Sequence, residues 1–198
     1  MSMRRTGKRR LFWALGGLIL GLAAIAAASD SDPETSTGPP GKIEFVGKNL
    51  FATANGTFHR WEIVESLLDP SALAESFAVV RVDLASIDTG IERRDDHLRN
   101  PDFFEVERYP FATVRVHSFR ADGETEAGLP RYMVRFDLDL HGVERTIEGQ
   151  VVLASESPLR VEGSLMLDRT DFGIGAPPSR WNPMSVGAEI PIRFEAEL

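Results

Sequence analysis

Polar and apolar residues alternate with a period of two along most of the chain from Ile43 onward. This alternation is typical of half-buried β-strands, because successive side chains of a strand point to opposite faces of its sheet. In the last segment, EIPIRFEAEL, one face would carry Ile190, Ile192 and Phe194, and the other face would carry mostly charged residues. The pattern predicts an all-β domain whose sheet has one apolar face.

A hairpin in the segment RYMVRFDLDLHGVERTIEGQVVL tests this prediction. His141-Gly142 suits a two-residue turn, and such a turn fixes the register of both arms. The pairs that then share the apolar face are Leu140 with Val143, Leu138 with Arg145, Phe136 with Ile147, Val134 with Gly149 and Tyr132 with Val151. The other face pairs Arg135 with Glu148, a favourable cross-strand charge pair. The turn and the alternation therefore agree.

We expect eight strands, at about residues 43–47, 50–63, 76–87, 110–119, 131–140, 143–153, 159–168 and 186–197. An antiparallel sheet of eight such strands avoids exposed edges by closing into a barrel, which either fills with side chains or holds one small ligand. A two-sheet sandwich is the alternative, because it needs the same alternation. Helical content is slight: one turn at 69–74 and a short helix at 92–98, before Asn100-Pro101.

The amino-terminal residues differ from this domain. Five cations precede residue 11, and the eighteen residues from Leu11 to Ala28 carry no charge. Residues 1–29 are therefore expected to form a hydrophobic helix that serves as a cleaved signal peptide, ending in small residues, or as a membrane anchor. Residues 30–41 are expected to form a disordered linker, and residues 42–198 are expected to form the barrel. Either form of the segment places the domain outside the cytoplasm.

The charge and residue types exclude several kinds of function. After the basic start, 17 basic residues stand against 30 acidic ones, so a nucleic-acid partner is not expected. The absence of cysteine excludes disulfides, thiol nucleophiles and cysteine zinc sites. Asp95, Asp96 and His97 are neighbours without a second spaced ligand group, so we expect no bound metal. No nucleophile motif is present, and we expect no catalysis.

Three motifs, SIDTGIERRDDHLRNPDFFEVERYP, LDLHGVERTI and LDRTDFGIG, resemble those of the YceI-like family of polyisoprenoid-binding, lipocalin-like proteins. The resemblance covers about residues 42–198. It implies an extended barrel, often periplasmic, that stores or carries a polyprenyl chain, a quinone or another lipid without catalysis or a covalent cofactor. We also allow for a homodimer. One departure is at Lys48-Asn49-Leu50, where the family usually has a histidine, so the headgroup of the ligand is left open.

Strand phase predicts which side chains face the interior and line the cavity. The predicted lining residues are Phe45, Phe51, Val80, Val82, Leu84, Val114, Val116, Tyr132, Val134, Phe136, Leu138, Ile147, Leu165, Ile192 and Phe194. Gly149 and Gly163 lie among them and would leave space. Arg145 could meet a polar headgroup at the cavity mouth, or extend past the rim into water. The interior could instead be completely filled, in which case the barrel would be a structural or protein-interaction module.

Two further segments are assigned to the ends of the barrel. Leu98, Phe103 and Phe104 lie in the stretch HLRNPDFFEVERYPFATV, residues 97–114; they would either line one end of the cavity or plug that end as ordinary core. Trp181 and Met184, in the loop APPSRWNPMSVG, would cover the other opening. Before that loop, we expect an internal ion pair of Arg169 with Asp168 or Asp171 to fix the chain.

Overall fold

The computed structural model describes residues 40–69 and 71–198. They lie within one compact unit, Pro33–Leu198, and all the core residues named below belong to this unit. The predicted signal peptide or anchor at 1–29, and the predicted linker up to residue 39, lie outside the described residues. Within the described part of the chain, no helix has both the length and the apolar character that a membrane span needs.

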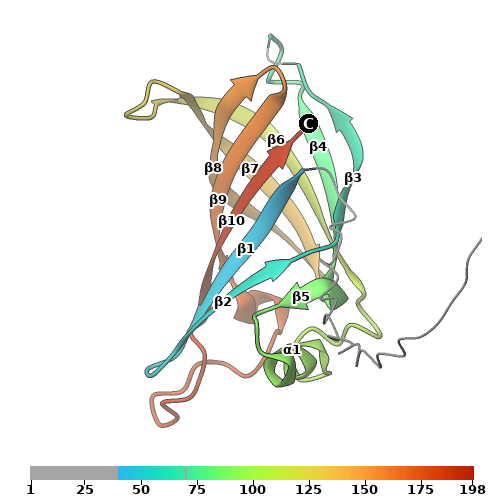
Figure 1. Cartoon of the computed structure of the whole chain (residues 1–198), viewed down its shortest axis with the longest axis vertical. Coiled ribbons are helices and arrows are strands. Elements are labelled where there is room, and N and C mark those ends of the chain that lie inside the picture. Colours follow the sequence, from blue (N-terminus) through green and yellow to red (C-terminus); the bar gives the residue numbers. More distant parts are fainter. Residues whose placement is uncertain (1–39, 70) are drawn as a thin grey trace, which may run out of the picture. The chain divides into compact units, whose positions relative to one another are not determined.

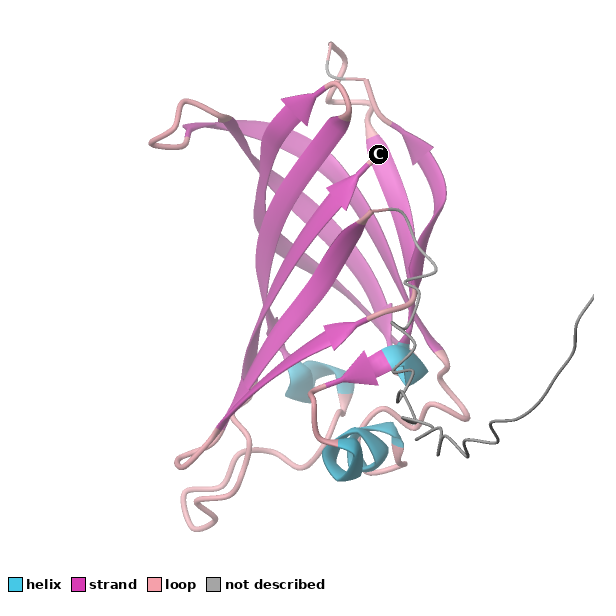
Figure 2. Ribbon diagram, viewed as in Figure 1, coloured by secondary structure: helices cyan, strands magenta, loops and turns pink. Residues whose placement is uncertain are grey.

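All strands belong to one antiparallel sheet that curls around an interior, as Figures 1 and 2 show. The strands are β1 (Gly41–Lys48), β2 (Thr53–Phe58), β3 (Trp61–Leu67), β4 (Phe77–Asp83), β5 (Ile87–Asp88), β6 (Phe111–Glu124), β7 (Pro130–Leu140), β8 (Val143–Glu156), β9 (Leu159–Asp168) and β10 (Glu189–Glu197). Their order in the sheet is β3-β4-β6-β7-β8-β9-β10-β1-β2-β5. The all-β prediction is confirmed, and the sandwich alternative is not found in this single sheet.

The strand count differs from the predicted eight, because two of the predicted strands are each divided. The predicted strand 50–63 becomes β2 and β3, and the predicted strand 76–87 becomes β4 and β5, separated by a single turn of 3-10 helix. At His59 and Arg60 the chain changes partners: β2 pairs with β1, whereas β3 pairs with β4. β2 and β3 are therefore consecutive in the chain but lie near opposite ends of the sheet order. The sheet must curl back on itself to bring them together.

The predicted hairpin register is confirmed along its whole length. β7 and β8 pair Leu140 with Val143, Leu138 with Arg145 and Val134 with Gly149. His141 has a φ of 55° and Gly142 a φ of 74°. Positive φ at both central residues is the requirement of the turn that best matches the twist of a two-residue hairpin.

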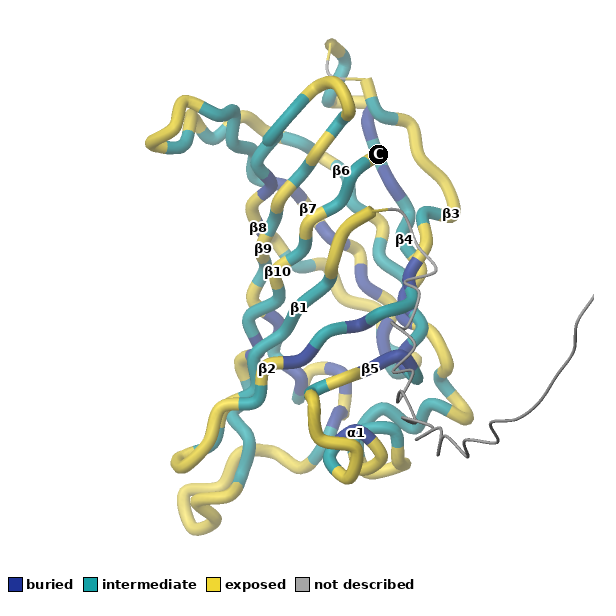
Figure 3. The backbone as a smooth tube through the Cα atoms, in the orientation of Figure 1, coloured by how far each residue is buried: buried dark blue, intermediate teal, exposed yellow. Residues whose placement is uncertain are grey.

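One end of the curled sheet is filled by a packed core. Trp61, Leu84, Leu138 and Phe172 are among its buried members. Figure 3 shows buried residues on β2 and β5, near this end, as well as along β4. The helix at this end is α1 (Glu92–Arg99), slightly longer than the predicted 92–98. The helical turn predicted at 69–74 is replaced by hydrogen-bonded turns, with Ala72 N donating to Asp69 O.

Helix α1 is fixed to the chain that precedes it. The buried carboxylate of Asp95 accepts a hydrogen bond from Thr89 N at 3.0 Å. Arg99 donates to two backbone carbonyls, Ala85 O at 3.0 Å and Ile87 O at 2.9 Å. Because these bonds use Asp95 and Arg99 to satisfy backbone groups, the charged residues of α1 serve to position the stretch that closes this end.

Candidate functional site: an apolar cavity inside the sheet

A cavity of about 180 Å³ lies inside the curled sheet, beyond the packed core. Its walls come from β1, β3, β4 and β6 to β10, together with the loop between β3 and β4. Of the 24 lining residues, only Asp69 and Ser76 are polar, apart from the phenol of Tyr132. A dry apolar cavity of about 150 Å³ holds benzene in another protein, whereas sites for larger ligands measure about 300–1,000 Å³. The cavity therefore fits a short apolar segment without rearrangement.

Nine of the predicted residues line this cavity: Val80, Val82, Val114, Val116, Tyr132, Phe136, Leu165, Ile192 and Phe194. Several of them, including Val80, Val116 and Ile192, are only partly buried although their strand phase turns them inward. Inward apolar side chains in a close-packed interior would be fully buried. Their residual exposure shows that they face the cavity rather than packed neighbours.

The end of the cavity away from α1 is lined by residues that were not among the predicted lining residues. These are Leu68, Leu73, Phe119, Leu153, Leu159 and Leu198. Phe119 faces inward because of a β-bulge: Ser118 has a φ of 57°, and the β6–β7 register shifts between His117 and Arg120. A bulge inserts one residue into a strand and reverses the alternation beyond it. The bulge itself has no signal in the alternation.

The loop between β3 and β4 satisfies its own polar groups next to this apolar space. Ser76, which is 2% exposed, accepts from Asp69 N at 3.0 Å and donates to Asp69 O at 3.2 Å. The Asp69 carboxylate accepts from the hydroxyl and the amide of Ser71, and these bonds lower the pKa of Asp69. Leu68 and Leu73 of the same loop line the cavity beside these hydrogen-bonded groups.

Eight other predicted lining residues lie in packed surroundings instead. Leu84, Val134 and Leu138 are buried in the two core clusters, at 2%, 1% and 8% exposure. The remaining five, Phe45, Leu98, Phe103, Phe104 and Ile147, pack against the core cluster at the α1 end. Leu98, Phe103 and Phe104 therefore plug this end, the second of the two roles considered for them. Strand phase predicts whether a side chain faces the interior, but not where along the interior it lies. These residues face the interior in its packed parts and not at the cavity.

Three predicted residues are solvent-exposed. Phe51 is 70% exposed, because residues 49–52 form a turn in which Asn49 Oδ1 accepts from the amides of Phe51 and Ala52. Trp181 is 95% exposed and is not among the residues that line the cavity. Arg145 lies opposite Leu138, as predicted, but its guanidinium turns out to Glu144 O at 2.9 Å. None of these three residues is among those that line the cavity, and Arg145 takes the second of the two orientations considered for it, outward into water.

The glycines of the inner face do not supply the empty space that the sequence suggested. A Cβ on Gly163 would lie 2.1 Å from Cζ of Phe194, its cross-strand partner. A Cβ on Gly149 would lie 2.9 Å from Cε2 of Phe136. Phe136 and Phe194 in turn contact each other edge to face, at 5.9 Å between ring centroids. The glycines thus provide room for aromatic rings that form the cavity wall.

Arg169 is buried without the predicted ion pair. Its guanidinium donates to four carbonyls, those of Ile174, Ala176, Val186 and Gly187. Burial lowers its pKa, while the nearby Asp168 opposes that shift. Asp168 itself accepts from the hydroxyl and amide of Thr170, which lower its pKa. Arg169 therefore holds both ends of the loop before β10 by hydrogen bonds to backbone.

The polar side chains do not form a metal site in the part of the chain that the structure covers. No group of three His, Asp or Glu side chains suited to a metal ion occurs in residues 40–69 and 71–198. Of the neighbouring Asp95, Asp96 and His97, Asp95 is turned to Thr89, and His97 Nε2 lies 3.6 Å from Asp102.

Comparison with known proteins agrees with this architecture. Residues 35–198 match the family model described as YceI-like domain. A UPF0312 protein of Vibrio cholerae is 30% identical over 170 residues, covering 79% of this chain and 87% of the relative. A UPF0312 protein of Pseudomonas syringae pv. tomato is 28% identical over 193 residues, covering 92% and 95%.

Solved structures share the fold at lower identity. Burkholderia cenocepacia BcnA superposes with a TM-score of 0.68 at 24% identity, covering 78% of this chain and 94% of BcnA. A polyisoprenoid-binding domain from Saccharophagus degradans, implicated in plant cell wall breakdown, gives a TM-score of 0.56 at 19% identity, covering 80% and 94%. These similarities concern the fold alone.

Proposed function

The chain belongs to the YceI-like family, and we propose that it binds a long apolar ligand, such as a polyisoprenoid, a quinone or another lipid, inside its curled sheet. The proposed role is storage or transport without catalysis, outside the cytoplasm. The observation that carries the proposal is the cavity itself, whose walls are apolar side chains contributed by eight strands. The basic and apolar amino terminus supports the location, because such a segment directs export or anchors a domain.

The chemistry of the walls selects for an apolar ligand. A polar or charged ligand would lose its hydrogen bonds to water and find almost no partners, at a cost of several kcal/mol. The polar lining groups are at the loop end, where Asp69 and Ser76 lie, and a headgroup would be placed there. The structural neighbour from Saccharophagus degradans, a polyisoprenoid-binding domain, supports the same class of ligand.

The size of the cavity sets how such a ligand binds. If a cavity of about 180 Å³ holds about seven carbons, in proportion to the six carbons of benzene in about 150 Å³, their burial at about 0.8 kcal/mol each supplies about 6 kcal/mol, which corresponds to a Kd of about 0.05 mM. Tighter binding of a long chain requires the partly buried wall residues to move apart, or the ligand to extend past the loop end. Affinity should therefore rise with the length of the isoprenoid chain.

Native mass spectrometry of the protein, purified after export, tests the proposal. The expected result is a stoichiometric apolar adduct that organic extraction recovers chemically unchanged. Titration with isoprenoid alcohols of increasing length should then give increasing affinity. A protein that stays ligand-free when offered polyprenols and quinones would refute the proposal and favour a structural or interaction module. An extracted lipid that is altered after incubation would instead indicate an enzyme.

A further inference from the structure

Two loops that are far apart in sequence form one tip of the compact unit Pro33–Leu198. They are the turn between β1 and β2, residues 48–53, and the loop before β10, residues 177–187; we call them together the apolar tip. Figure 1 shows them side by side. Leu50 N donates to Pro183 O at 3.3 Å, and Gly187 N donates to Lys48 O at 2.8 Å. The two loops are therefore joined by backbone hydrogen bonds.

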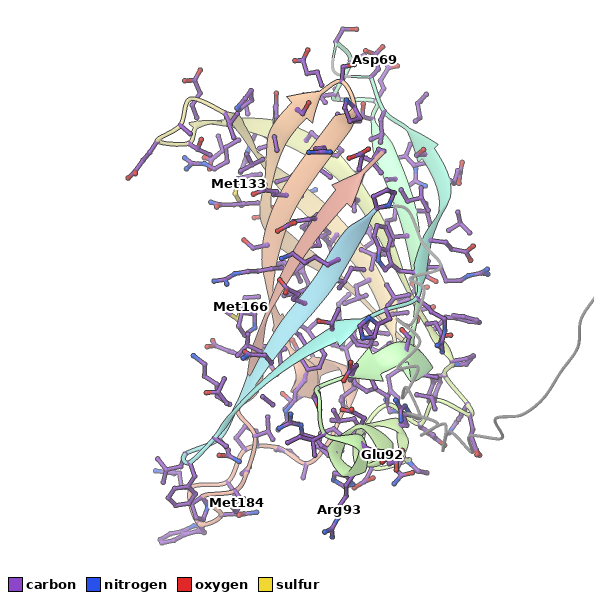
Figure 4. The ribbon with its side chains drawn as sticks, viewed as in Figure 1. Asp69, Glu92, Arg93, Met133, Met166 and Met184 are labelled. Carbon is purple, nitrogen blue, oxygen red and sulfur yellow. The ribbon has the colours of Figure 1, made fainter. Side chains whose placement is uncertain are left out.

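The apolar tip carries the four most exposed large apolar side chains of the described chain. Trp181 is 95% exposed, Leu50 75%, Phe51 70% and Met184 61%. Figure 4 shows Met184 at the extremity of the tip and Asp69 at the opposite end of the sheet. Single exposed apolar residues are common, but a cluster of this kind marks a surface that contacts something apolar.

The charge of the tip is opposite to that of the rest of the domain. Residues 40–198 contain 17 basic and 27 acidic side chains, yet the segments 45–61 and 172–188 contain no Asp or Glu. Lys48 and Arg180, the cations of the tip, are exposed and form no ion pair with any residue that the structure describes. The tip thus combines aromatic and aliphatic side chains with unpaired positive charge in an otherwise acidic domain.

The tip is also ordered by its own hydrogen bonds. Asn49 Oδ1 holds the first loop, and the buried Arg169 holds the second at Ala176 O (2.8 Å) and Val186 O (2.7 Å). Exposed apolar side chains on a preordered backbone lose little conformational entropy when they bind.

We propose that the apolar tip inserts into the interface of an anionic lipid bilayer, with Trp181 and Phe51 at the boundary of headgroups and acyl chains. Protein segments that anchor at a membrane interface typically combine tryptophan or phenylalanine with nearby lysine or arginine. Lys48 and Arg180 then face the anionic headgroups, while the acidic remainder of the domain is kept in water. This contact is independent of the cavity. It would hold the loop end of the cavity, near Asp69, away from the bilayer.

Vesicle flotation of the compact unit Pro33–Leu198 tests the proposal, because this unit lacks the apolar stretch 11–28 that could bind lipid by itself. The unit should float with vesicles of phosphatidylcholine and phosphatidylglycerol. Binding to phosphatidylcholine alone should be about 30-fold weaker, since each of two cations contributes about fivefold. Phe51→Ser and Leu50→Ser should each weaken binding about tenfold.

Leu67→Ser is the matched control, because Leu67 is 54% exposed at the other end of the sheet and should leave flotation unchanged. In the full chain with Trp13→Phe, brominated lipid should quench the emission of Trp181, and Trp181→Phe should remove this quenching. Equal flotation of the Phe51→Ser variant and the native unit, with both folded by circular dichroism, would overturn the proposal. A second result would also overturn the proposal: the native unit binds no vesicles but self-associates, and Phe51→Ser abolishes this self-association. The tip would then contact a second copy of the chain.

Discussion

Replacing Val116 by phenylalanine probes the cavity directly, and Val134→Phe provides a matched control on the adjacent strand. Val116 lies on β6, lines the cavity and pairs with Phe136. Val134 lies on β7, is 1% exposed and belongs to a packed cluster outside the cavity lining. Both substitutions add the same ring to the inner face of the sheet. Only the ring at residue 116 has space to enter.

The expected difference follows from the volumes. The cavity of about 180 Å³ exceeds the space of about 150 Å³ that accommodates benzene, so the ring of Val116→Phe fits and changes stability by only about 1 kcal/mol, in the favourable direction. Val134→Phe overpacks a filled site and should cost about 1–3 kcal/mol. The two variants should therefore differ by about 2–4 kcal/mol, or roughly 5–15 °C in Tm for a domain of this size.

Urea unfolding gives the two stabilities, and ligand titration gives the second readout. Val116→Phe should weaken lipid binding at least tenfold, because the ring occupies the volume that about seven ligand carbons would take. Equal destabilisation by the two substitutions would show that the wall at Val116 is packed and that the inferred void does not exist. A stable Val116→Phe variant with unchanged affinity would place the ligand elsewhere.

Two further predictions concern the wall and the outer face of the sheet. Gly163→Ala places a methyl group 2.1 Å from Cζ of Phe194 and should lower the free energy of unfolding by about 1–3 kcal/mol in urea titrations; adding Phe194→Leu should restore part of this loss. A hydrogen bond from Thr146, followed by the nearby charges of His117 and Arg115, keeps the pKa of Asp137 below its usual value. The stabilisation by this carboxylate is complete above its unfolded pKa of about 3.9 and is lost as the pH falls through the lower folded pKa. Asp137→Asn should therefore flatten the decline of the urea midpoint below about pH 4, and an unchanged acid slope would contradict this assignment.

The sequence predicted the strands well because their signal is local. Alternation defines which side chains face inward, and His141-Gly142 defines the register of β7 and β8 with no information from the rest of the chain. The nine predicted residues that line the cavity all lie on strands whose phase is uninterrupted up to that point. The same reasoning missed Phe119, because the bulge at Ser118 reverses the phase.

The differences from the prediction have one physical source. Alternation predicts which face of the sheet a side chain lies on, but it predicts neither how far along the interior the side chain lies nor which residues it contacts. Phe45 and Phe194 each lie over a glycine of the neighbouring strand, yet only Phe194 lines the cavity. Phe51 was predicted to face the interior and Trp181 to cover an opening, whereas both side chains are exposed, at 70% and 95%. Arg169 satisfies carbonyls rather than a carboxylate, because the path of the loop from Gly173 onward brings those carbonyls around it.

The sequence by itself determined an acidic all-β domain with an apolar inner face, the register of its central hairpin, and its resemblance to the YceI-like family. The tertiary structure decided that the chain changes partners at His59 and Arg60, that the α1 end is plugged while the opposite end retains a cavity, and that Leu50, Phe51, Trp181 and Met184 meet at one tip. The first set depends on periods and turns within about twenty residues. The second depends on contacts between distant segments, which only the curling of the sheet brings together.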